Sequence, residues 1–311
     1  ISSIDAEKLE NKPSLNVQDA LQGNAAGVRV TANSGSPGAS MTVQIRGIGT
    51  VNNSDPLYVV DGFPVDNIDY LNPKDIKSIE VLKGASASAI YGSRAANGVV
   101  LVTTKGGEAG KTKVSFDGYY GMQQVTNTPD LLNMQQWLNV INTARDNAGI
   151  EELDLIEPAD DPNHTTDWFD EVTRTAAIQD YNLSVSGGSE VSTFHFSGNY
   201  FNQEGVIKGS DYERITLRLN SDYNISDKLT VGNNISISNS NRHMINEGDH
   251  FNGIVNTAIK LDPITPARDD EGEFVSSPYT DVKNPVAQIA HTNDENETLR
   301  LVGNVFAEYE I

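Results

Sequence analysis

The chain contains no cysteine, and this absence removes several kinds of chemistry at once. A protein without cysteine has no disulfide, no thiolate metal site and no cysteine nucleophile. The five histidines, at positions 164, 195, 243, 250 and 291, show no metal-ligand spacing, and no serine lies in a nucleophile-elbow context. We therefore expect a protein that is not an enzyme and that binds no cofactor and no metal.

Basic residues are scarce: 22 lysines and arginines stand against 43 aspartates and glutamates, for a formal net charge of −21. Nucleic-acid binding needs a basic surface, so this composition argues against it. The carboxylates crowd into segments 151–170 and 262–297, which we expect to be solvated loops. Cation binding by these segments is the alternative.

Long hydrophobic runs are also missing, since no apolar stretch approaches the roughly 20 residues that a membrane-spanning helix needs. This excludes a helical membrane protein but not a transmembrane barrel, whose alternating strands leave a weak hydropathy signal. The sequence begins at Ile1 without a methionine or a signal peptide, so we expect its N-terminus to be processed or incomplete.

Residues 70–105 are the most structured-looking part of the sequence and predict helix, strand, helix, strand. Pro73 suits the first position of a short helical turn. Residues 79–82 predict a strand, residues 85–91 a helix capped by Gly92, and residues 99–103 a strand buried on both faces. Upstream, residues 16–21 predict a short helix and residues 28–30, 42–45 and 57–60 three strands. We expect one small sheet with two or three helices packed on it.

These same residues carry a family resemblance. The stretch IEVLKGASASAIYGSRAANGVVLVTTKGG, with the preceding LQGNAAGVRVTANSGSPGASMTVQIRGIGTVNNSDPLYVVDGFPVD, resembles the plug domain of the SusC/RagA family. Members of that family are TonB-dependent outer-membrane importers of Bacteroidetes. The resemblance implies an α+β plug (residues 1–107) followed by antiparallel strands (residues 108–311) that belong to a transmembrane β-barrel of about 22 strands.

The resemblance also implies a function. Family members import glycans or oligopeptides across the outer membrane of a Gram-negative, Bacteroidetes-type cell. The implied partners are a SusD-like surface lipoprotein, TonB with ExbB and ExbD, the substrate, and outer-membrane lipid. Two alternatives stay open: a TonB-dependent importer of siderophores or haem, and a soluble all-β adhesin with an α/β cap.

Beyond Gly107 the residues themselves predict long amphipathic strands. Ile215, Leu217 and Leu219, for example, alternate with Thr216 and Arg218. This period of two gives each strand one apolar and one polar face. The pattern predicts six strands, at about 112–126, 177–188, 191–206, 211–225, 228–242 and 298–311.

The connections between these strands favour a barrel over a sandwich. Residues 187–190 and 226–227 are tight turns after the second and fourth strands, whereas the longest connections run to roughly 50 residues or more. All long loops therefore share one end, as in outer-membrane barrels. Six strands cannot close around such a plug, so we expect these residues to be a fragment of a longer protein, with the family's TonB-contacting segment missing.

The first long loop predicts two helices, at residues 133–147 and from Thr165 onward. Their apolar faces are expected to pack on the outer rim of the barrel, and a docking surface for a lipoprotein is the alternative.

The resemblance places six substrate-facing residues on outward loops of the plug: Asn52, Asn53, Asp55, Asp66, Asn67 and Tyr70. Amides, carboxylates and an aromatic ring suit sugar hydroxyls or a peptide backbone, and they are also what turns contain. It further implies that Arg46 and Arg94 form a polar lock with barrel glutamates beyond residue 311. The alternative is that both are ordinary surface arginines. Glycines at 92–98 and 106–110 are expected to make the plug compliant.

Overall fold

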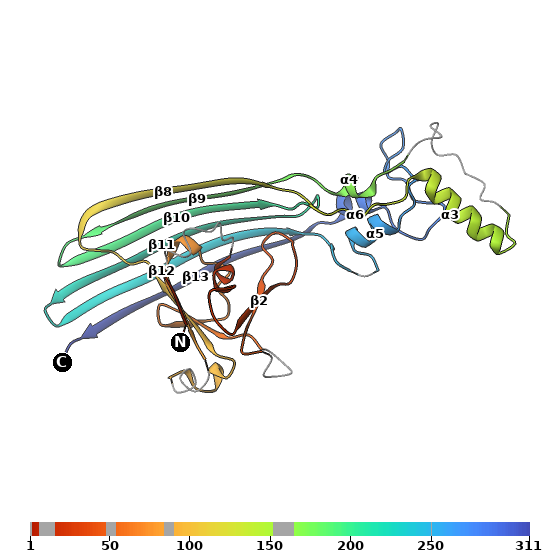
Figure 1. Ribbon diagram of the computed structural model, residues 1–311. Coiled ribbons are helices and arrows are strands. Elements are labelled where there is room, and N and C mark those ends of the chain that lie inside the picture. Colours follow the sequence, from red (N-terminus) through yellow and green to blue (C-terminus); the bar gives the residue numbers. More distant parts are fainter. Residues whose placement is uncertain (1, 6–15, 48–53, 84–89, 152–164, 250) are drawn as a thin grey trace.

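The structure, a computed structural model, describes residues 2–5, 16–47, 54–83, 90–151, 165–249 and 251–311. Figure 1 shows two parts: a long, twisted sheet, and a smaller α/β unit beneath one of its faces. The helices of the connecting loops gather at one end of the sheet. Below, the α/β unit is called the plug, the long sheet the wall, and the two ends of the wall the loop end and the turn end.

The plug is built on a five-stranded sheet with the order β1-β6-β7-β4-β5. Its strands are β1 (Ser2–Asp5), β4 (Leu57–Val60), β5 (Phe63–Val65), β6 (Ile76–Leu82) and β7 (Val99–Thr104). The central strand β7 pairs antiparallel with β6 and parallel with β4. Val99, Val100 and Val102 are fully buried, which confirms the expected strand in the plug interior.

The plug differs from the sequence prediction in two respects. Strands β2 (Val28–Ala32) and β3 (Met41–Ile45) form a separate two-stranded hairpin, so the prediction of one sheet was wrong. Their apolar side chains, such as Val30 and Val43, join the plug core from the side. Strands β1 and β5 were not predicted. Each is too short to show a period, and β1 exists through its pairing with β6.

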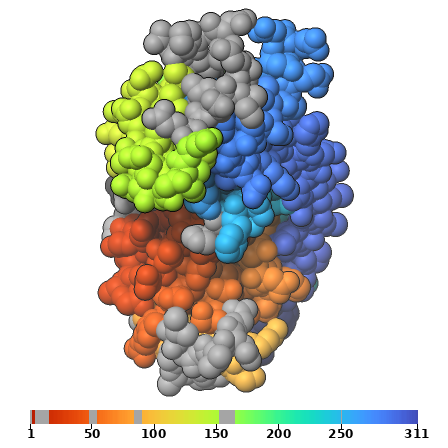
Figure 2. Space-filling view, turned by 90° about the vertical axis from the view of Figure 1, so that its right-hand side faces the viewer, coloured from red at the N-terminus to blue at the C-terminus, as the bar shows by residue number. Residues whose placement is uncertain are grey.

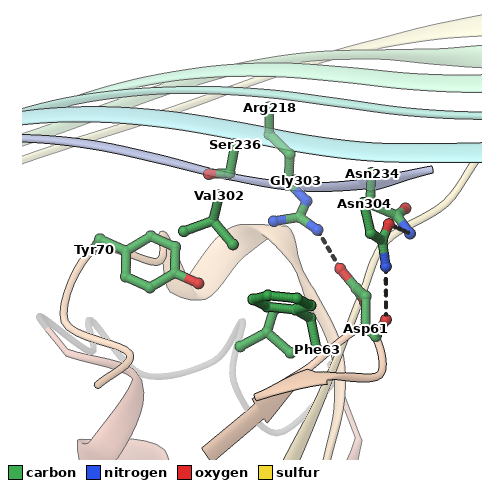
Figure 3. A pocket seen from close by; sticks show the side chains of 10 residues that line it. Asp61, Phe63, Tyr70, Arg218, Asn234, Ser236, Val302, Gly303 and Asn304 are labelled. Atoms are coloured by element: carbon green, nitrogen blue, oxygen red, sulfur yellow. Dashed lines mark hydrogen bonds and ion pairs between the residues drawn. The ribbon is translucent and has the colours of Figure 1, made fainter. Parts of the chain in front are cut away.

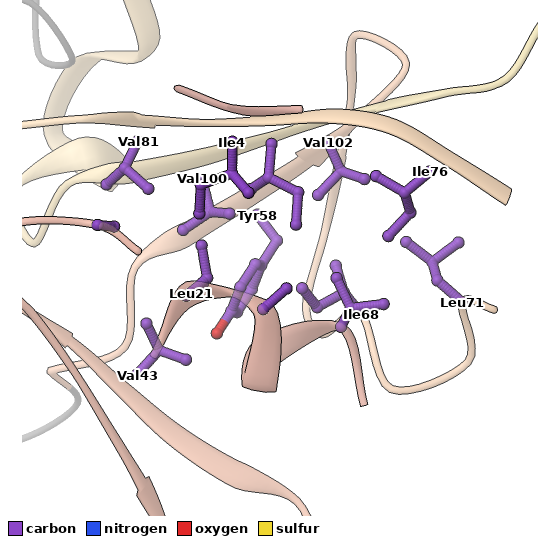
Figure 4. Packing of buried hydrophobic residues seen from close by; sticks show 14 of the residues in the cluster. Ile4, Leu21, Val43, Tyr58, Ile68, Leu71, Ile76, Val81, Val100 and Val102 are labelled. Carbon is purple, nitrogen blue, oxygen red and sulfur yellow. The ribbon is translucent and has the colours of Figure 1, made fainter. Parts of the chain in front are cut away.

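The described part of the plug also contains three short 3₁₀ helices: η1 (Val17–Leu21), η2 (Pro73–Asp75) and η3 (Gly92–Ala95). Figure 4 shows the core that they help to enclose, with Leu21 of η1 close to Val43, Tyr58 and Val100. The predicted helix at 85–91 lies largely in residues 84–89, outside the described part of the chain.

The wall is one antiparallel sheet of six long strands in sequential order. They are β8 (Gly110–Gln123), β9 (Ala176–Gly188), β10 (Ser192–Glu204), β11 (Asp211–Ser226), β12 (Leu229–Met244) and β13 (Asp294–Tyr309). The β9–β10 and β11–β12 connections are tight turns at one end, which confirms the predicted strands and the sorting of loops. The sheet is open, with β8 and β13 at its edges.

The described residues of the long loops form four helices: α3 (Met134–Asn147), α4 (Trp168–Val172), α5 (Ile254–Lys260) and α6 (Pro285–His291). The first two were predicted. Helices α4 to α6 share a core with Trp168 at its centre, whose indole Nε1 donates to the Asp262 carbonyl over 2.8 Å. Figure 2, seen from the loop end, shows the lime and blue loop segments side by side above the red and orange plug. None of the described helices has the length and apolar character to cross a membrane.

Candidate functional site

The wall buries its polar face and exposes its apolar face. On β11, Thr216, Arg218 and Asn220 are almost fully buried, whereas Leu217 and Leu219 are 45% and 40% exposed. The buried face points toward the plug. A soluble protein arranges its sheets the other way round, so the exposed face has the composition of a surface in contact with lipid.

Tyrosines border this apolar belt on both sides. Tyr120, Tyr181 and Tyr200 are exposed on neighbouring strands toward the loop end, and Tyr223 and Tyr309 are exposed toward the turn end. Aromatic girdles of this kind mark the two membrane–water interfaces of transmembrane barrels. The distribution therefore agrees with the expectation that the apolar sides of these strands face outward.

One plug segment, residues 61–70, is held by arginines from the wall. Its first residue, Asp61, sits in a tight β4–β5 turn with a positive φ of 47°, next to Gly62. Arg218 of β11 forms an ion pair with the Asp61 carboxylate, and the two side chains are only 3% and 11% exposed. Thr104 of β7 donates to the same carboxylate through its backbone N–H and its hydroxyl, at 2.9 and 2.8 Å. This network joins two plug strands to the wall.

Two further arginines contact the same segment through neutral groups. Arg300 of β13 donates to the Asn67 side-chain oxygen over 2.7 Å and lies 5.0 Å from the Tyr70 ring centroid. Arg214 of β11 donates to the backbone carbonyl of Asp69 over 2.5 Å. Arginine suits these positions because its planar guanidinium both donates in several directions and stacks on aromatic rings.

Further contacts attach the plug to the wall on either side of this segment. Asn220 donates to the Lys105 carbonyl over 2.8 Å, just before the chain crosses into the wall. On the other side, Asn72 donates to Asn182 over 2.8 Å, and Lys74 pairs with Asp180 at 3.1 Å. Hydrogen bonds and an ion pair therefore attach the plug to the wall at several places along the interface.

A small cavity lies in this interface, between Asp61, Tyr70, Arg218 and the strands β12 and β13 (Figure 3). Three buried atoms that belong to its lining residues have no hydrogen-bond partner in the described structure: Tyr70 Oη, Ser236 Oγ and Arg218 Nε. Burial raises the pKa of Tyr70, and the charges of Arg218 and Arg300 oppose that rise. At about 20 Å³ the cavity has room for a water molecule but not for a sugar or a peptide.

The predicted substrate-facing residues are spread over different environments. Asn52 and Asn53 lie outside the described residues. Asp55 and Asp66 are exposed, whereas Asn67 contacts Arg300 and Tyr70 is 6% exposed at the wall. Their contact with substrate stays a prediction.

Arg46 and Arg94 are both exposed on the plug, and Arg46 has a positive φ of 60°. Their pairing with glutamates beyond residue 311 stays a prediction.

The arginines of the wall were missed in the sequence. Arg214, Arg218 and Arg300 each occupy the polar face of a strand whose other face is apolar. A charged residue at such a position was the available signal, because it must face the plug or water. Among the described residues, no group of three histidines and carboxylates is arranged to hold a metal ion.

Comparison with known proteins shows which proteins this chain resembles. Residues 1–99 match the TonB-dependent Receptor Plug Domain family. TonB-dependent receptor P26 of Formosa agariphila is 38% identical, over 99% of this chain and 31% of its own length. TonB-dependent receptor SusC of Bacteroides thetaiotaomicron is 30% identical, over 99% of this chain and 33% of its own length. The chain thus spans about a third of these relatives.

Solved structures agree. The RagAB peptide importer in its open-open state covers 100% of this chain with a TM-score of 0.84 and 29% identity, and the match covers 38% of that chain. By sequence, siderophore receptors match over a shorter stretch: the ferric enterobactin receptor PirA of Pseudomonas aeruginosa is 34% identical over 34% of this chain and 16% of its own length. In structure, the siderophore receptor PirA of Acinetobacter baumannii shares the fold over 82% of this chain and 33% of its own, with a TM-score of 0.54 and 22% identity.

A plug docked on the polar face of an amphipathic antiparallel sheet, with residues 1–99 matching the plug family, defines a class: the chain belongs to the TonB-dependent receptors. Within that class it is of the SusC/RagA type, since its likeness to SusC and to the RagAB importer extends over the whole of the sequence.

Proposed function

We propose that this chain is part of an outer-membrane importer energised by TonB with ExbB and ExbD. The observation that carries the proposal is the wall itself: lipid-compatible side chains on one face, and on the other a buried polar face that binds the plug. A plug held by polar contacts can be displaced into water at modest cost, because each separated group regains hydration.

We further propose that the importer works with a SusD-like surface lipoprotein and carries glycans or oligopeptides. Support comes from similarity to SusC and to RagAB, described as a peptide importer, over the whole chain. An importer of siderophores is the second candidate, because siderophore receptors also match, although over about a third of the sequence.

The experiment is growth of a strain lacking the full-length gene on single glycans, defined oligopeptides or single iron sources. The expected result is loss of growth on one glycan or peptide class, restored by the full-length gene but not by a version lacking the TonB-contacting segment. A defect confined to iron-siderophore sources would support the second candidate. Normal growth on all of them would contradict import.

Substrate contact is proposed for the outward plug loops, at Asn52, Asn53, Asp55, Asp66, Asn67 and Tyr70. Alanine at Asn52, Asn53 and Asp66 together is expected to weaken substrate binding by the purified receptor. Tyr70→Phe tests the sixth position separately, since it keeps the ring beside Arg300 and removes only the hydroxyl, so weaker binding would assign that hydroxyl to the substrate. Unchanged affinity in the triple variant would remove these residues from the site.

The predicted polar lock is kept as a proposal for Arg46 and Arg94. Both side chains are exposed in this structure and thus accessible to further strands of a barrel. Replacing both by glutamine is expected to loosen the plug, measured as faster proteolysis of the plug in the intact receptor.

A further inference from the structure

Arg214 is a buried cation that lacks an anionic partner in the described structure. It is 2% exposed on the inner face of β11. Its Nη1 donates to the Asp69 carbonyl, its guanidinium lies 5.5 Å from the Phe201 ring centroid, and its Nε has no partner. Buried charges are usually paired with an opposite charge, so this arrangement calls for an explanation.

The residue whose carbonyl Arg214 contacts, Asp69, also carries a carboxylate. The Asp69 carboxylate is turned into the plug, where it accepts a hydrogen bond from Nε2 of Gln18 in η1. Gln18 is 2% exposed, and its Oε1 has no partner in the described structure. The charge of Asp69 is also felt by Tyr58: burial is the main cause that raises the pKa of this tyrosine, and Asp55 and Asp69 add to it.

We propose that Asp69 is a switch with two alternative partners, Gln18 in the plug and Arg214 in the wall. Gln18 holds the carboxylate on the plug side while η1 is in place. Once Gln18 is withdrawn, rotation of the Asp69 side chain brings the carboxylate to Arg214. The backbone needs little movement, since the Asp69 carbonyl is already 2.5 Å from the guanidinium.

The switch would make displacement of the plug a two-stage process. In the docked state, residues 61–70 carry one ion pair to the wall, between Asp61 and Arg218. Withdrawal of η1 adds a second, between Asp69 and Arg214. The N-terminal elements of the plug can thus leave while residues 61–70 become more firmly attached. This last step rests on the proposed import function, whereas the exchange of partners does not.

The test is a double-mutant cycle between Asp69 and Arg214 in two backgrounds, wild type and Gln18→Glu. Glutamate has the shape of glutamine but repels the Asp69 carboxylate, so it drives the exchange without deleting buried volume. The full-length receptor in detergent carries Ser197→Cys, a small replacement on the buried inner face of β10, and maleimide labelling reports detachment of the plug. The single changes are Asp69→Asn and Arg214→Gln.

With Gln18 present, we expect the labelling rate of the Asp69→Asn, Arg214→Gln double variant to differ by less than about twofold from the product of the two single effects. In the Gln18→Glu background we expect this difference to be about tenfold. Equal coupling in the two backgrounds, whether small or large, overturns the proposal. If Gln18→Glu fails to assemble, Gln18→Ala provides the second background. Labelling is measured on the purified receptor and does not depend on growth. A negative growth experiment would therefore not contradict the exchange of partners, and a negative double-mutant cycle would not contradict the import function.

Discussion

Loss of Arg218 should loosen the plug more than any other single change at the interface. The change considered is Arg218→Met, which keeps an unbranched apolar stem and removes the guanidinium. It leaves the Asp61 carboxylate, 11% exposed, with Thr104 as its remaining partner in the described interface. Breaking a buried ion pair by removing one partner costs about 3–5 kcal/mol, which is a rise in the detached population of roughly a hundredfold to several thousandfold.

The assay is maleimide labelling of Ser238→Cys in the full-length receptor in detergent. Ser238 is 3% exposed on the inner face of β12 and pairs in register with Thr216, two residues from Arg218. When reclosing is faster than labelling, the labelling rate is proportional to the detached population. The matched control is Lys113→Met, which breaks the exposed Lys113–Glu108 pair and should change the rate little.

The decisive variant combines Arg218→Met with Asp61→Asn, so that neither charge remains. It should label more slowly than Arg218→Met alone, because no uncompensated charge is left in the interface. Labelling of Arg218→Met within threefold of the parent would refute the assignment of this pair as the main plug–wall contact. So would a double variant that labels as fast as the product of the two single effects predicts.

Three further predictions follow from the wall. Leu217→Arg places a charge in the apolar belt and should destabilise the membrane-inserted barrel by about 2–4 kcal/mol, measured by urea unfolding in lipid vesicles, whereas Leu217→Val should have little effect. Gly107→Ala should destabilise the plug–wall connection by about 1–3 kcal/mol, because the new Cβ would clash with the backbone of Phe194. Gly106→Ala is the control, since its Cβ would meet no atom within 4 Å, and thermal unfolding compares the two variants. His243, near the loop end of β12 and beyond the apolar belt, has a pKa raised mainly by its hydrogen bond to Asp211, with Nε2 3.7 Å from Glu295. Protonated His243 therefore stabilises these strand ends fully below the ordinary histidine pKa, and this stabilisation is lost as pH rises through the raised pKa. Backbone hydrogen exchange at these strand ends should accelerate with pH by more than its intrinsic pH dependence. Asp211→Asn should remove this additional acceleration.

Much of the wall could be predicted from local sequence, because each strand repeats a simple rule. In a run such as residues 215–219, the alternation of apolar and polar residues is enough to predict a strand and its two faces, and the extent of such a run predicts the strand's length, without information from any other part of the chain. Tight turns and long loops then fix which strand ends lie together. The same reasoning failed for β1, whose four residues contain one buried apolar side chain, Ile4, and whose structure depends on β6.

The site was harder to predict because its partners are far apart in sequence. Arg218 and Asp61 are separated by 157 positions, and the sequence around each residue does not indicate that the other is its partner. The plug arginines Arg46 and Arg94 drew attention since they stand beside glycines, yet both are exposed on the described surface of the plug. Pairing across two separately folded parts depends on how the plug is rotated against the wall, and only a three-dimensional structure contains that information.

The placement of the buried arginines on the wall also has a physical consequence for an importer. When the plug is displaced, Arg214, Arg218 and Arg300 would face the interior of the barrel, where water can solvate them, and Asp61 would be solvated on the plug. A small shift of the plug then costs much free energy, because the charges of the ion pair stay buried but are poorly aligned. Complete separation costs less, because water hydrates both charges. An apolar interface of the same area would behave in the opposite way, since it tolerates sliding but resists full exposure to water. Polar contacts therefore suit a plug that must hold one position and yet be removable.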